Sequence, residues 1–420
     1  MSKRNVVITG LGFVTSIGNS KAQVLESLQK SISGIELYEP FNVPNCPVKC
    51  MGTVKGFKIE TTDPEDWEYP SEYSIRRDVL RGFSPHCLFA YCAMKQAVAD
   101  AKLADEEISN PYTGMYTASA GSTSTLYSNM QKLDKAGVMR VSPMGVVSSV
   151  VGTLSFNLVS CFKIKGASCG FASACASSSH AMGFAYDEIA SGRQKRMFVV
   201  GGEDGDYRTI LPFAGMRALS ISSDPKRASR PYDKHRDGFV GTGGAVVAVL
   251  EDEEVARARN AKIYARFSGW GQGSDGYNVA IPHPQGDGLA LAIQNAFSST
   301  GISSGEIDYI NSHATSTLIG DIAELRAIAK TIGDSPRAAI SSTKSLTGHG
   351  LSLAGVMESA FCALAIDEGF MPESANIEEL DEAAKPFNIL REVKFEAPKK
   401  VMSLSSGFGG ANTALIFEKA

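Results

Sequence analysis

The sequence predicts an α/β protein built from two duplicated halves, and three observations support this expectation. Short apolar runs that end at glycine or at a polar turn alternate with longer stretches of helical character. The segments that begin at Gly241 and Gly407 share the pattern G-x-G-G-A-x-x-A, and an apolar segment follows each one. Two helical stretches, ending at Gly192 and Gly369, recur in the same order at a comparable spacing. A chance match of small residues is the alternative interpretation, because such residues are common.

The expected strands and helices follow from these patterns. Five apolar runs have the length and the flanking turns of buried strands: VVITGLG (6–12), GMYTASAG (114–121), MFVVGGEDG (197–205), IDYINSH (307–313) and VMSLSSG (401–407). The clearest helices are AMGFAYDEIASG (181–192) and AGVMESAFCALAIDEG (354–369), and each ends with the glycine expected at a helix C-terminus. We place the boundary between the halves near the charged stretch 251–262, which gives domains of residues 1–255 and 256–420.

The composition excludes several classes of function. The chain has 420 residues, of which 43% are hydrophobic and 20% charged, so we expect an ordered globular protein with a large core. A net charge of -4 gives no general attraction to nucleic acid or to an anionic membrane. The sequence contains neither a long apolar run nor a signal-peptide pattern at its start, so we expect a cytoplasmic protein that does not enter a membrane.

The sequence gives little support for a metal or a nucleotide cofactor. The eight cysteines lack paired CxxC spacing, and we expect free thiols in a reducing compartment. Cys46 and Cys50 could supply half of a metal site, but their segment contains proline and has no histidine nearby. The segment GLGFVTSIG (10–18) resembles a dinucleotide-binding loop, yet Thr15 stands where the third glycine is required.

Cys175 is the first candidate for chemistry. It lies in FASACASSSH (171–180), directly before the helix that ends at Gly192. A thiol at a helix N-terminus meets unpaired backbone N–H groups, so we expect its pKa to fall below about 8.5. The alternative is a buried core cysteine, which is the commoner case. His180 follows five residues later on a different face of the helix, so we expect it to be structural.

The other candidates come from the second half. If the halves are duplicates, His349 occupies the position that Cys175 has in the first half, and both residues should face a shared cleft. His313 follows a predicted strand, where α/β proteins often carry functional groups. Lys344 lies with His349 in SSTKSLTGHG (341–350), a segment too rich in Ser, Thr and Gly to form a core.

The polar residues after His313 have two interpretations. Thr315 and Thr317 present two hydroxyl groups that suit a polar substrate arm. Asp321 and Glu324 have the spacing of a capping box before a helix over 321–332, so they could be helix caps instead of functional groups.

Taken together, these segments resemble the thiolase-fold condensing enzymes, specifically the bacterial elongating 3-oxoacyl-[acyl-carrier-protein] synthases of type I. The resemblance covers essentially the whole chain, and its motifs are NVVITGLGFVTSIGNS (5–20), SACASSSHAMG (173–183), RPYDKHRDGFV (230–240), NSHATSTLIGD (311–321), STKSLTGHG (342–350), NIEELDEAAKPFNI (376–389) and GFGGANTALIFE (407–418). Thiolases use a second cysteine near the C-terminus, and initiating synthases use Cys, His and Asn, whereas this chain has the Cys, His, His set of the elongating synthases. The resemblance implies a thiolase-like fold with layers in the order α-β-α-β-α.

The resemblance also implies a mechanism. The Cys175 thiolate would accept an acyl group from acyl carrier protein, and malonyl carrier protein would then lose carbon dioxide and attack the acyl thioester. Neutral His313 and His349 would each donate an N–H to the malonyl thioester oxygen, with the tautomer fixed by a partner of the other ring nitrogen. The resemblance assigns Lys344 and Glu324 to ordering the site around His313.

Further roles follow from the same resemblance. The backbone N–H groups of Cys175 and Phe408 would form the oxyanion hole, and Phe408 would gate between the half-reactions. Thr315 and Thr317 would bind the phosphopantetheine arm of the carrier protein, and no other cofactor or metal is implied. We expect a homodimer and an acidic acyl carrier protein as partner, docked on basic residues: Arg76, Arg77, Arg81, Lys132, Lys135 and Arg140. For any single one of these, a solvated charged face is the alternative.

Three departures from the family pattern lie near the implied site. Ala314 and Leu318 replace the Gly and Pro of HGTSTP, Ser406 replaces a Phe two residues before Phe408, and GHGLSLAG replaces GHSLGAAG. We therefore expect condensation with an altered acyl-chain preference. The same chemistry in a polyketide or polyene pathway is one alternative. A non-catalytic partner resembling a chain-length factor, or a chain-starting decarboxylase, is another, although such proteins lack the nucleophilic cysteine.

Overall fold

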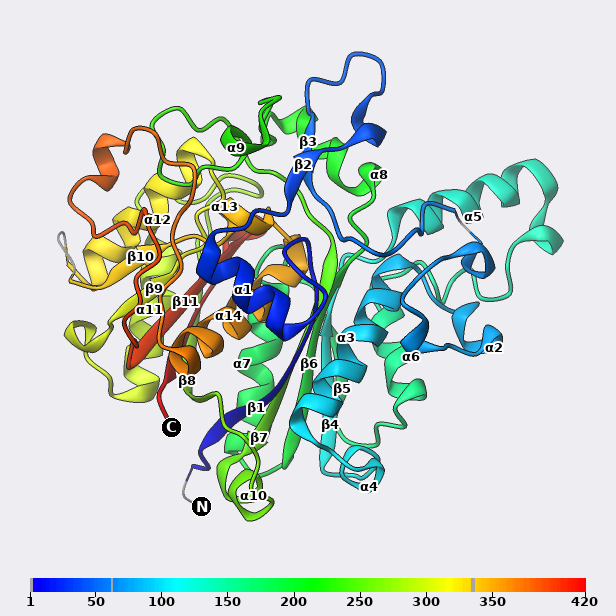
Figure 1. Cartoon of the computed structure of the whole chain (residues 1–420), viewed down its shortest axis with the longest axis horizontal. Helices are drawn as coiled ribbons and strands as arrows, with labels where there is room; N and C mark the ends of the chain where they lie inside the picture. Colours follow the sequence, from blue (N-terminus) through cyan, green and yellow to red (C-terminus); the bar gives the residue numbers. More distant parts are fainter. Residues whose placement is uncertain (1–2, 62, 334–336) are drawn as a thin grey trace.

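The strands form one ten-stranded mixed sheet in the order β10-β9-β11-β12-β8-β1-β7-β6-β4-β5 (Figure 1). The computed structural model describes residues 3–61, 63–333 and 337–420. The sheet strands of the first half are β1 (Val6–Val14), β4 (Thr113–Ala118), β5 (Ser168–Phe171), β6 (Arg196–Glu203) and β7 (Gly244–Asp252). Those of the second half are β8 (Ala265–Ser274), β9 (Tyr309–Asn311), β10 (Ala339–Ser341), β11 (Lys400–Gly407) and β12 (Ala411–Glu418).

The strand order confirms the predicted duplication. If the sheet strands of each half are numbered 1 to 5 in chain order, both halves have the spatial order 3-2-4-5-1, read from the outer edge of the sheet toward its middle. In both halves strand 2 pairs in parallel with strands 3 and 4, and strand 5 pairs antiparallel with strands 4 and 1. The two G-x-G-G-A segments both lead into fifth strands, β7 and β12. Antiparallel pairing of β1 with β8 joins the halves, and the division at residue 255 stays a prediction.

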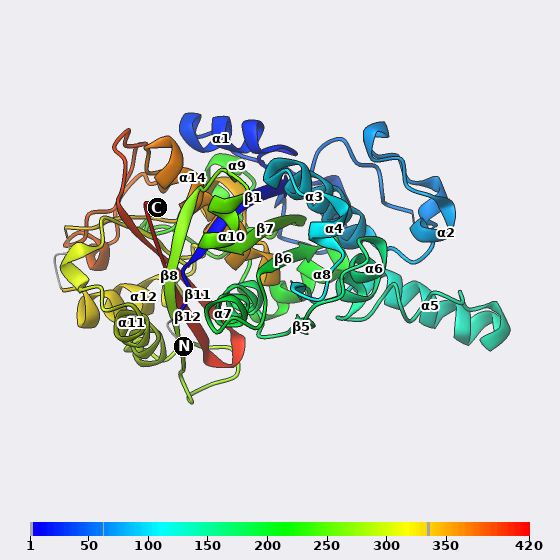
Figure 2. The same cartoon turned by 90° about the horizontal axis from the view of Figure 1, so that it is seen from below.

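Helices cover both faces of the sheet and also fill the space between its halves. Helices α7 (Ser177–Ala190) and α14 (Ala354–Glu368) pack on each other and contact strands of both halves. Helix α3 (Pro85–Ala101) covers the outer face of the first half, and α11 (Asp287–Thr300) with α12 (Leu318–Thr331) covers that of the second (Figure 2). The arrangement is the five-layer α-β-α-β-α order that the family resemblance implied.

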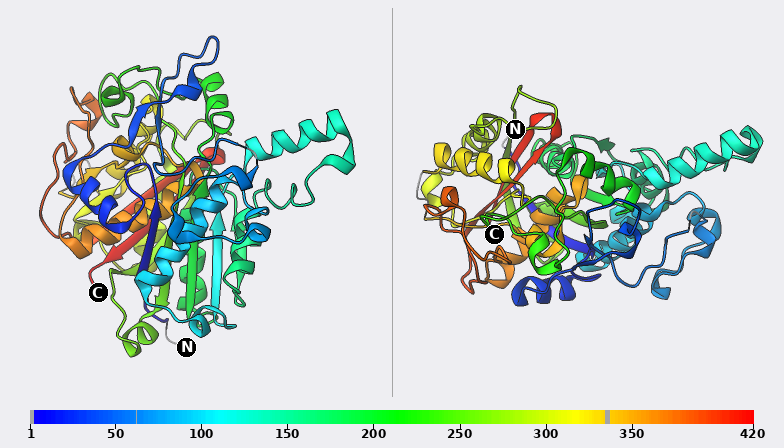
Figure 3. Two further views of the ribbon diagram at one scale, coloured as in Figure 1. Left: turned by 45° about the vertical axis from the view of Figure 1, so that its right-hand side comes forward. Right: turned by 90° about the horizontal axis from the view of Figure 1, so that it is seen from above.

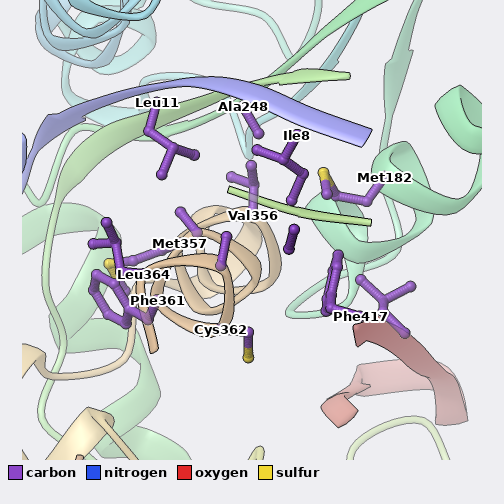
Figure 4. Packing of buried hydrophobic residues seen from close by; sticks show 14 of the residues in the cluster. Ile8, Leu11, Met182, Ala248, Val356, Met357, Phe361, Cys362, Leu364 and Phe417 are labelled. Carbon is purple, nitrogen blue, oxygen red and sulfur yellow. The ribbon is translucent and has the colours of Figure 1, made fainter. Parts of the chain in front are cut away.

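The central layer contains the largest core cluster. Helix α14 is buried on all sides because sheet or helix surrounds it, and its Val356, Met357 and Phe361 lie in one cluster with Ile8 and Leu11 of β1 (Figure 4). A helix in this position needs apolar residues around its whole circumference. Rigid packing of this layer fixes the loops that enter both central helices, including those that carry Cys175 and His349.

The remaining elements surround this framework. The other helices are α1 (Lys21–Lys30), α2 (Arg77–Leu80), α4 (Asp105–Ile108), α5 (Thr123–Ala136), α6 (Thr153–Cys161), α8 (Tyr207–Ile210), α9 (Pro225–Ala228), α10 (Glu253–Ala258) and α13 (Lys344–Thr347), and β2 (Ile35–Leu37) pairs with β3 (Cys50–Gly52). Helix α5 and the chain after it project from the body as an arm (Figure 3). Within the described ranges, no helix is long and apolar enough to cross a membrane, and no cluster of side chains could hold a metal ion.

Candidate active site

Seven of the predicted functional residues meet in one cavity at the carboxyl ends of parallel strands, whereas Lys344 is not part of its lining. Cys175 follows β5, His313 follows β9, Lys344 and His349 follow β10, and Phe408 follows β11. The cavity has a volume of about 390 Å³, within the range of small-molecule sites. Its lining includes seven of the predicted residues: Cys175, His313, Thr315, Thr317, Glu324, His349 and Phe408. The topology therefore brings together residues that lie far apart in the sequence.

Cys175 is held in a tight turn between β5 and α7. Ala174 has a left-handed backbone (φ 49°), and α7 begins at Ser177, so the turn places the cysteine at the helix N-terminus. Left-handed backbone is costly for a residue other than glycine, and such strain is found at functional turns. A Cβ built on Gly407 would lie 3.2 Å from the backbone N of Cys175, so the segment before Phe408 lies directly against the nucleophile. The N–H of Cys175 donates to no other residue in the described chain, which leaves it available to an oxyanion.

The expected low pKa of the Cys175 thiol is wrong. Burial raises its pKa to about 12, and the nearby Lys344 ammonium opposes that rise only in part. Loss of hydration disfavours a thiolate, and this effect is larger than the opposing effect of the Lys344 charge. The cysteine is therefore a protonated thiol at rest, and its attack on an acyl group requires a base in the cavity.

His313 and His349 form a perpendicular pair. Their ring centroids lie 5.3 Å apart at 86°. The backbone of His349 is fixed from the other half of the protein, because its N–H donates to Val240 O at 2.6 Å and its carbonyl accepts from Thr242 N at 3.1 Å. Burial and the Lys344 ammonium lower the pKa of both imidazoles well below the usual value. Both rings are therefore neutral, and each carries one proton.

The structure does not contain the expected partners that would fix the histidine tautomers. Within the described residues, the Nδ1 atoms of His313 and His349 are buried without a hydrogen-bond partner. Burial and the charge of Lys344 favour the neutral form of both rings. The partner that fixes each tautomer stays a prediction.

Glu324 positions the loop that carries His313. Its two carboxylate oxygens accept from the backbone N–H of His313 at 2.6 Å and of Ala314 at 2.8 Å. Burial raises the pKa of Glu324 to about 8, while these N–H groups and Lys344 act in the opposite direction. Because both oxygens accept from a backbone N–H, the geometry favours the ionised carboxylate. The predicted capping-box pairing of Asp321 with Glu324 is wrong, because α12 begins at Leu318 with Thr317 at its N-cap. Asp321 nevertheless caps the helix, since its carboxylate accepts from the N–H of Thr317 at 3.3 Å, and it also forms an ion pair with Arg236 at 3.1 Å.

Sequence reasoning missed Glu358, the partner of Lys344. Both side chains are buried, at 1% exposed for Lys344 and 0% for Glu358, and they form an ion pair. Burial raises the pKa of Glu358 to about 7, and the Lys344 ammonium opposes this rise. A signal was present in the sequence, since Glu358 is an acidic residue inside the apolar stretch AGVMESAFCALA. A buried acid of this kind requires a buried cation nearby.

Thr315, Thr317 and Phe408 also line the cavity. The two threonine hydroxyl oxygens are 3.1 Å apart and line the cavity. Phe408 is 38% exposed, and its ring centroid lies 6.0 Å from that of Phe213. The N–H of the following Gly409 donates to Val279 O at 2.7 Å, so the Phe408 turn is linked to the loop after β8.

The predicted docking residues form two exposed groups. Arg76 pairs with Asp78, while Arg77 and Arg81 pair with Glu65, so acidic neighbours partly offset the positive charge of the first group. The second group lies on α5 and the turn after it, and consists of Lys132, Lys135 and Arg140. Among described residues, no carboxylate lies within ion-pair distance of this second group. It is therefore the more strongly positive of the two surfaces.

His180 lies outside the cavity, whereas the three departures from the family pattern lie at it. The His180 ring stacks with Phe184 and meets Trp270 edge-on, and its Nδ1 lies 2.9 Å from Ser173 Oγ. His180 is not part of the cavity lining. In contrast, Ala314, Leu318 and Ser406 all line the cavity, and so does Leu351 of the GHGLSLAG segment. Each of the three departures therefore contributes a residue to the cavity lining.

Fold and site together define a thiolase-like condensing enzyme, with one cysteine facing two neutral histidines across duplicated halves. The family model of the beta-ketoacyl synthase N-terminal domain matches residues 3–256, and that of the C-terminal domain matches residues 264–378. The chain belongs to the beta-ketoacyl synthase family.

Named relatives agree with this assignment. The 3-oxoacyl-[acyl-carrier-protein] synthase 1 of Haemophilus influenzae is 39% identical over 423 residues, which cover 99% of each chain. The Escherichia coli K12 protein of the same name is 39% identical over 422 residues, again with 99% of each chain covered. A solved beta-ketoacyl synthase from Burkholderia phymatum has a TM-score of 0.91 at 31% identity, covering 99% of this chain and 100% of that one. The ishigamide ketosynthase/chain length factor gives a TM-score of 0.89 at 27% identity, with 100% of both chains covered.

Proposed function

We propose that this protein condenses a Cys175-bound acyl group with malonyl-acyl carrier protein, with loss of carbon dioxide, to give 3-oxoacyl-acyl carrier protein in fatty acid elongation. The observation that carries the proposal is the meeting of Cys175 with two neutral histidines in one mostly apolar cavity. The names of the two 39% identical relatives give the reaction and the carrier.

In the first half-reaction, Cys175 takes the acyl group. Because burial keeps the thiol protonated, a neutral imidazole of the pair accepts its proton as sulfur attacks the thioester carbonyl. The N–H groups of Cys175 and Phe408 hold the oxyanion, which is the charge that develops in the transition state. The phosphopantetheine thiol then leaves and takes up one proton.

In the second half-reaction, the malonyl thioester oxygen accepts an N–H from His313 and one from His349. These two hydrogen bonds stabilise the enolate that forms when the bond to the carboxylate breaks and carbon dioxide leaves. The resulting carbanion attacks the acyl thioester, and the Cys175 sulfur leaves and recovers a proton. A protonated imidazole is not required at this step, which matches the lowered pKa of both rings.

Lys344 and Glu324 are positioning residues in this scheme. Glu324 holds the backbone of the His313 loop, and the Lys344 charge keeps both rings neutral. Thr315 and Thr317, which line the cavity, are proposed to bind the phosphopantetheine arm, and Phe408 is proposed to act as a gate between the two half-reactions. We propose no further cofactor and no metal.

The proposed partner is acyl carrier protein, bound near the basic residues of α5. Carrier proteins appear in the names of the curated relatives, and the Lys132, Lys135, Arg140 group offers positive charge for an acidic partner. Arg76, Arg77 and Arg81 are proposed as a second contact, weakened by their own acidic neighbours. A cytoplasmic location is proposed as well, supported by eight cysteines that are all free.

The projecting arm supports a homodimer. Val138 and Met139, which follow α5, are 70% and 90% exposed, and the edge strand β5 is exposed along most of its length. An apolar projection beside an open sheet edge is a surface that proteins usually cover. Sedimentation analysis of wild type and Met139→Asp tests this, and we expect a dimer that weakens in the variant. A monomeric wild type would contradict it.

A polyketide or polyene pathway is the second candidate. The structural likeness to the ishigamide ketosynthase/chain length factor favours it, while the higher identity to 3-oxoacyl-[acyl-carrier-protein] synthases favours elongation. The presence of Cys175 argues against a non-catalytic partner. The test of activity is condensation of an acyl carrier thioester with malonyl carrier protein by wild type, Cys175→Ala and the control Cys161→Ala. We expect 3-oxoacyl product from wild type and control only, and product from Cys175→Ala would refute the proposal.

A further inference from the structure

The backbone turn between His349 and helix α14 is strained. Leu351 has a left-handed backbone (φ 51°), lines the cavity and begins the short 3₁₀ turn Leu351–Leu353. This conformation is unfavourable for a large side chain, and it persists only where surrounding contacts enforce it. The turn before Cys175 has the same feature at Ala174 (φ 49°). The turn after His349 therefore needs contacts that hold it in place.

A buried acid from the first half supplies such a contact. Glu203, the last residue of β6, is 1% exposed, and its Oε1 accepts a hydrogen bond from the hydroxyl group of Ser352. The same oxygen accepts from the N–H of Ala120 at 3.1 Å, while Oε2 has no hydrogen-bond partner among the described residues. Glu203 and Ser352 lie 149 residues apart in the sequence, so their contact joins the two halves of the protein directly after Leu351.

The first half holds both ends of this turn. The backbone of His349 itself is fixed by its hydrogen bonds with Val240 and Thr242, and the serine hydroxyl fixes the turn three residues later. The His313 loop has a comparable contact, because the buried Glu324 accepts from two of its backbone N–H groups. Each of the two histidines therefore lies in a segment that a buried acid holds.

We propose that Glu203 and Ser352 are positioning residues for His349, and that their contact aims its N–H at the malonyl thioester oxygen. The inference rests on the proposed condensing function, in which decarboxylation uses an N–H from each of the two histidines. Neither Glu203 nor Ser352 lines the cavity, so both act through the turn. Loss of the contact should slow decarboxylation, while acylation of Cys175 needs one imidazole only and should change much less.

The test measures both partial reactions in Ser352→Ala, which removes the hydroxyl donor and little else. Decarboxylation of malonyl carrier protein, normalised to the number of Cys175 sites that acylate, should fall about fivefold or more because one buried hydrogen bond is lost. The fall should lie in kcat, with KM for malonyl carrier protein unchanged. Ser352→Thr keeps a hydroxyl group and should recover most of the rate. Ser359→Ala is the matched control, because this buried serine donates to Gly355 O within its own helix.

Replacement of Glu203 tests the other side of the contact. Burial raises the pKa of Glu203 to about 8, so at pH 7 its side chain is mainly the neutral acid. Glu203→Gln resembles that acid, keeps an acceptor oxygen and should retain most of the decarboxylation rate. Glu203→Leu removes the acceptor and should be at least as slow as Ser352→Ala. The double variant Glu203→Leu with Ser352→Ala should be no slower than Glu203→Leu alone, because both changes break the same contact.

The outcomes separate this inference from the proposed function. A wild-type decarboxylation rate in acylated Ser352→Ala would overturn the positioning inference and leave the condensing function in place. An equal loss of the acylation and decarboxylation rates, or effects that multiply in the double variant, would overturn it as well. If wild type neither acquires an acyl group on Cys175 nor releases carbon dioxide, the proposed function fails and the inference fails with it.

Discussion

Replacement of Glu324 should impair decarboxylation much more than acyl transfer. The carboxylate accepts from the backbone N–H groups of His313 and Ala314 at 2.6 and 2.8 Å. Within the described chain it forms no hydrogen bond with the loop that carries Cys175. Hydrogen bonds to a charged group contribute about 1.5–3 kcal/mol each, and neutral ones about 1 kcal/mol. Glu324→Gln keeps one acceptor and turns an amide N–H toward the other backbone donor, so it should lose one bond, or about 1–3 kcal/mol.

The rates follow from these energies. If the loss is expressed in the transition state, Glu324→Gln should lower malonyl decarboxylation between about fivefold and about a hundredfold. Glu324→Ala leaves both N–H groups without their acceptor and should lower it further. Acylation of Cys175 needs only one imidazole of the pair to accept the thiol proton, whereas decarboxylation uses the N–H groups of both rings, so acylation should change much less. The assay compares the two partial reactions in one preparation, with intact-protein mass for acylation and carbon dioxide release for decarboxylation.

A matched control is available in the other half of the protein. Glu251 is also a fully buried carboxylate, with ion pairs to Arg196 and Arg259. Glu251→Gln should lower stability while leaving the ratio of the two partial reactions unchanged. The reasoning is refuted if Glu324→Gln decarboxylates at the wild-type rate, or if its acylation falls as much as its decarboxylation.

Three further predictions concern pH, the buried ion pair and docking. Burial raises the pKa of Glu203 to about 8, so between pH 4.5 and 8 the folded state retains a proton that the unfolded state has lost. The free energy of unfolding should therefore fall by a few kcal/mol as the pH rises from about 4.5 to 8. Denaturant titrations should show that Glu203→Gln removes most of this pH dependence. Lys344→Met leaves Glu358 unpaired and should lower the free energy of unfolding by about 3–5 kcal/mol. Adding Glu358→Leu should recover part of this loss, and wild-type stability in the Lys344→Met variant would argue against the buried ion pair. Lys132→Glu with Lys135→Glu should raise KM for acyl carrier protein but not for an acyl-pantetheine thioester, and equal effects on both would contradict docking on α5.

Much of the fold could be predicted because local patterns and tertiary structure agree. The five apolar runs fall on β1, β4, β6, β9 and β11, and the glycines at 192 and 369 follow α7 and end α14 with left-handed backbone. The repeated glycine motif marks equivalent strands, because both halves close their sheets in the same way. The start of α12 was misplaced, since its first turn contains Leu318 and Ile319, which carry no capping signal.

The site was harder to predict where its properties depend on burial. The convergence of Cys175, His313 and His349 followed from the duplication and the family resemblance, yet the thiol pKa was predicted in the wrong direction. A helix N-terminus is visible in sequence, whereas the loss of water around a side chain depends on every element that packs over it. Glu358 was missed for a related reason, because its pairing with Lys344 joins two segments whose contact only the fold provides.

The most direct test of the proposed mechanism is peptide mapping after incubation with acyl-acyl carrier protein, before and after addition of malonyl carrier protein. The mechanism predicts one acyl group, located on Cys175, which malonyl carrier protein discharges with release of one carbon dioxide per 3-oxoacyl product. An acyl group on another residue such as Cys169, which is exposed on β5, or discharge without carbon dioxide, would contradict it.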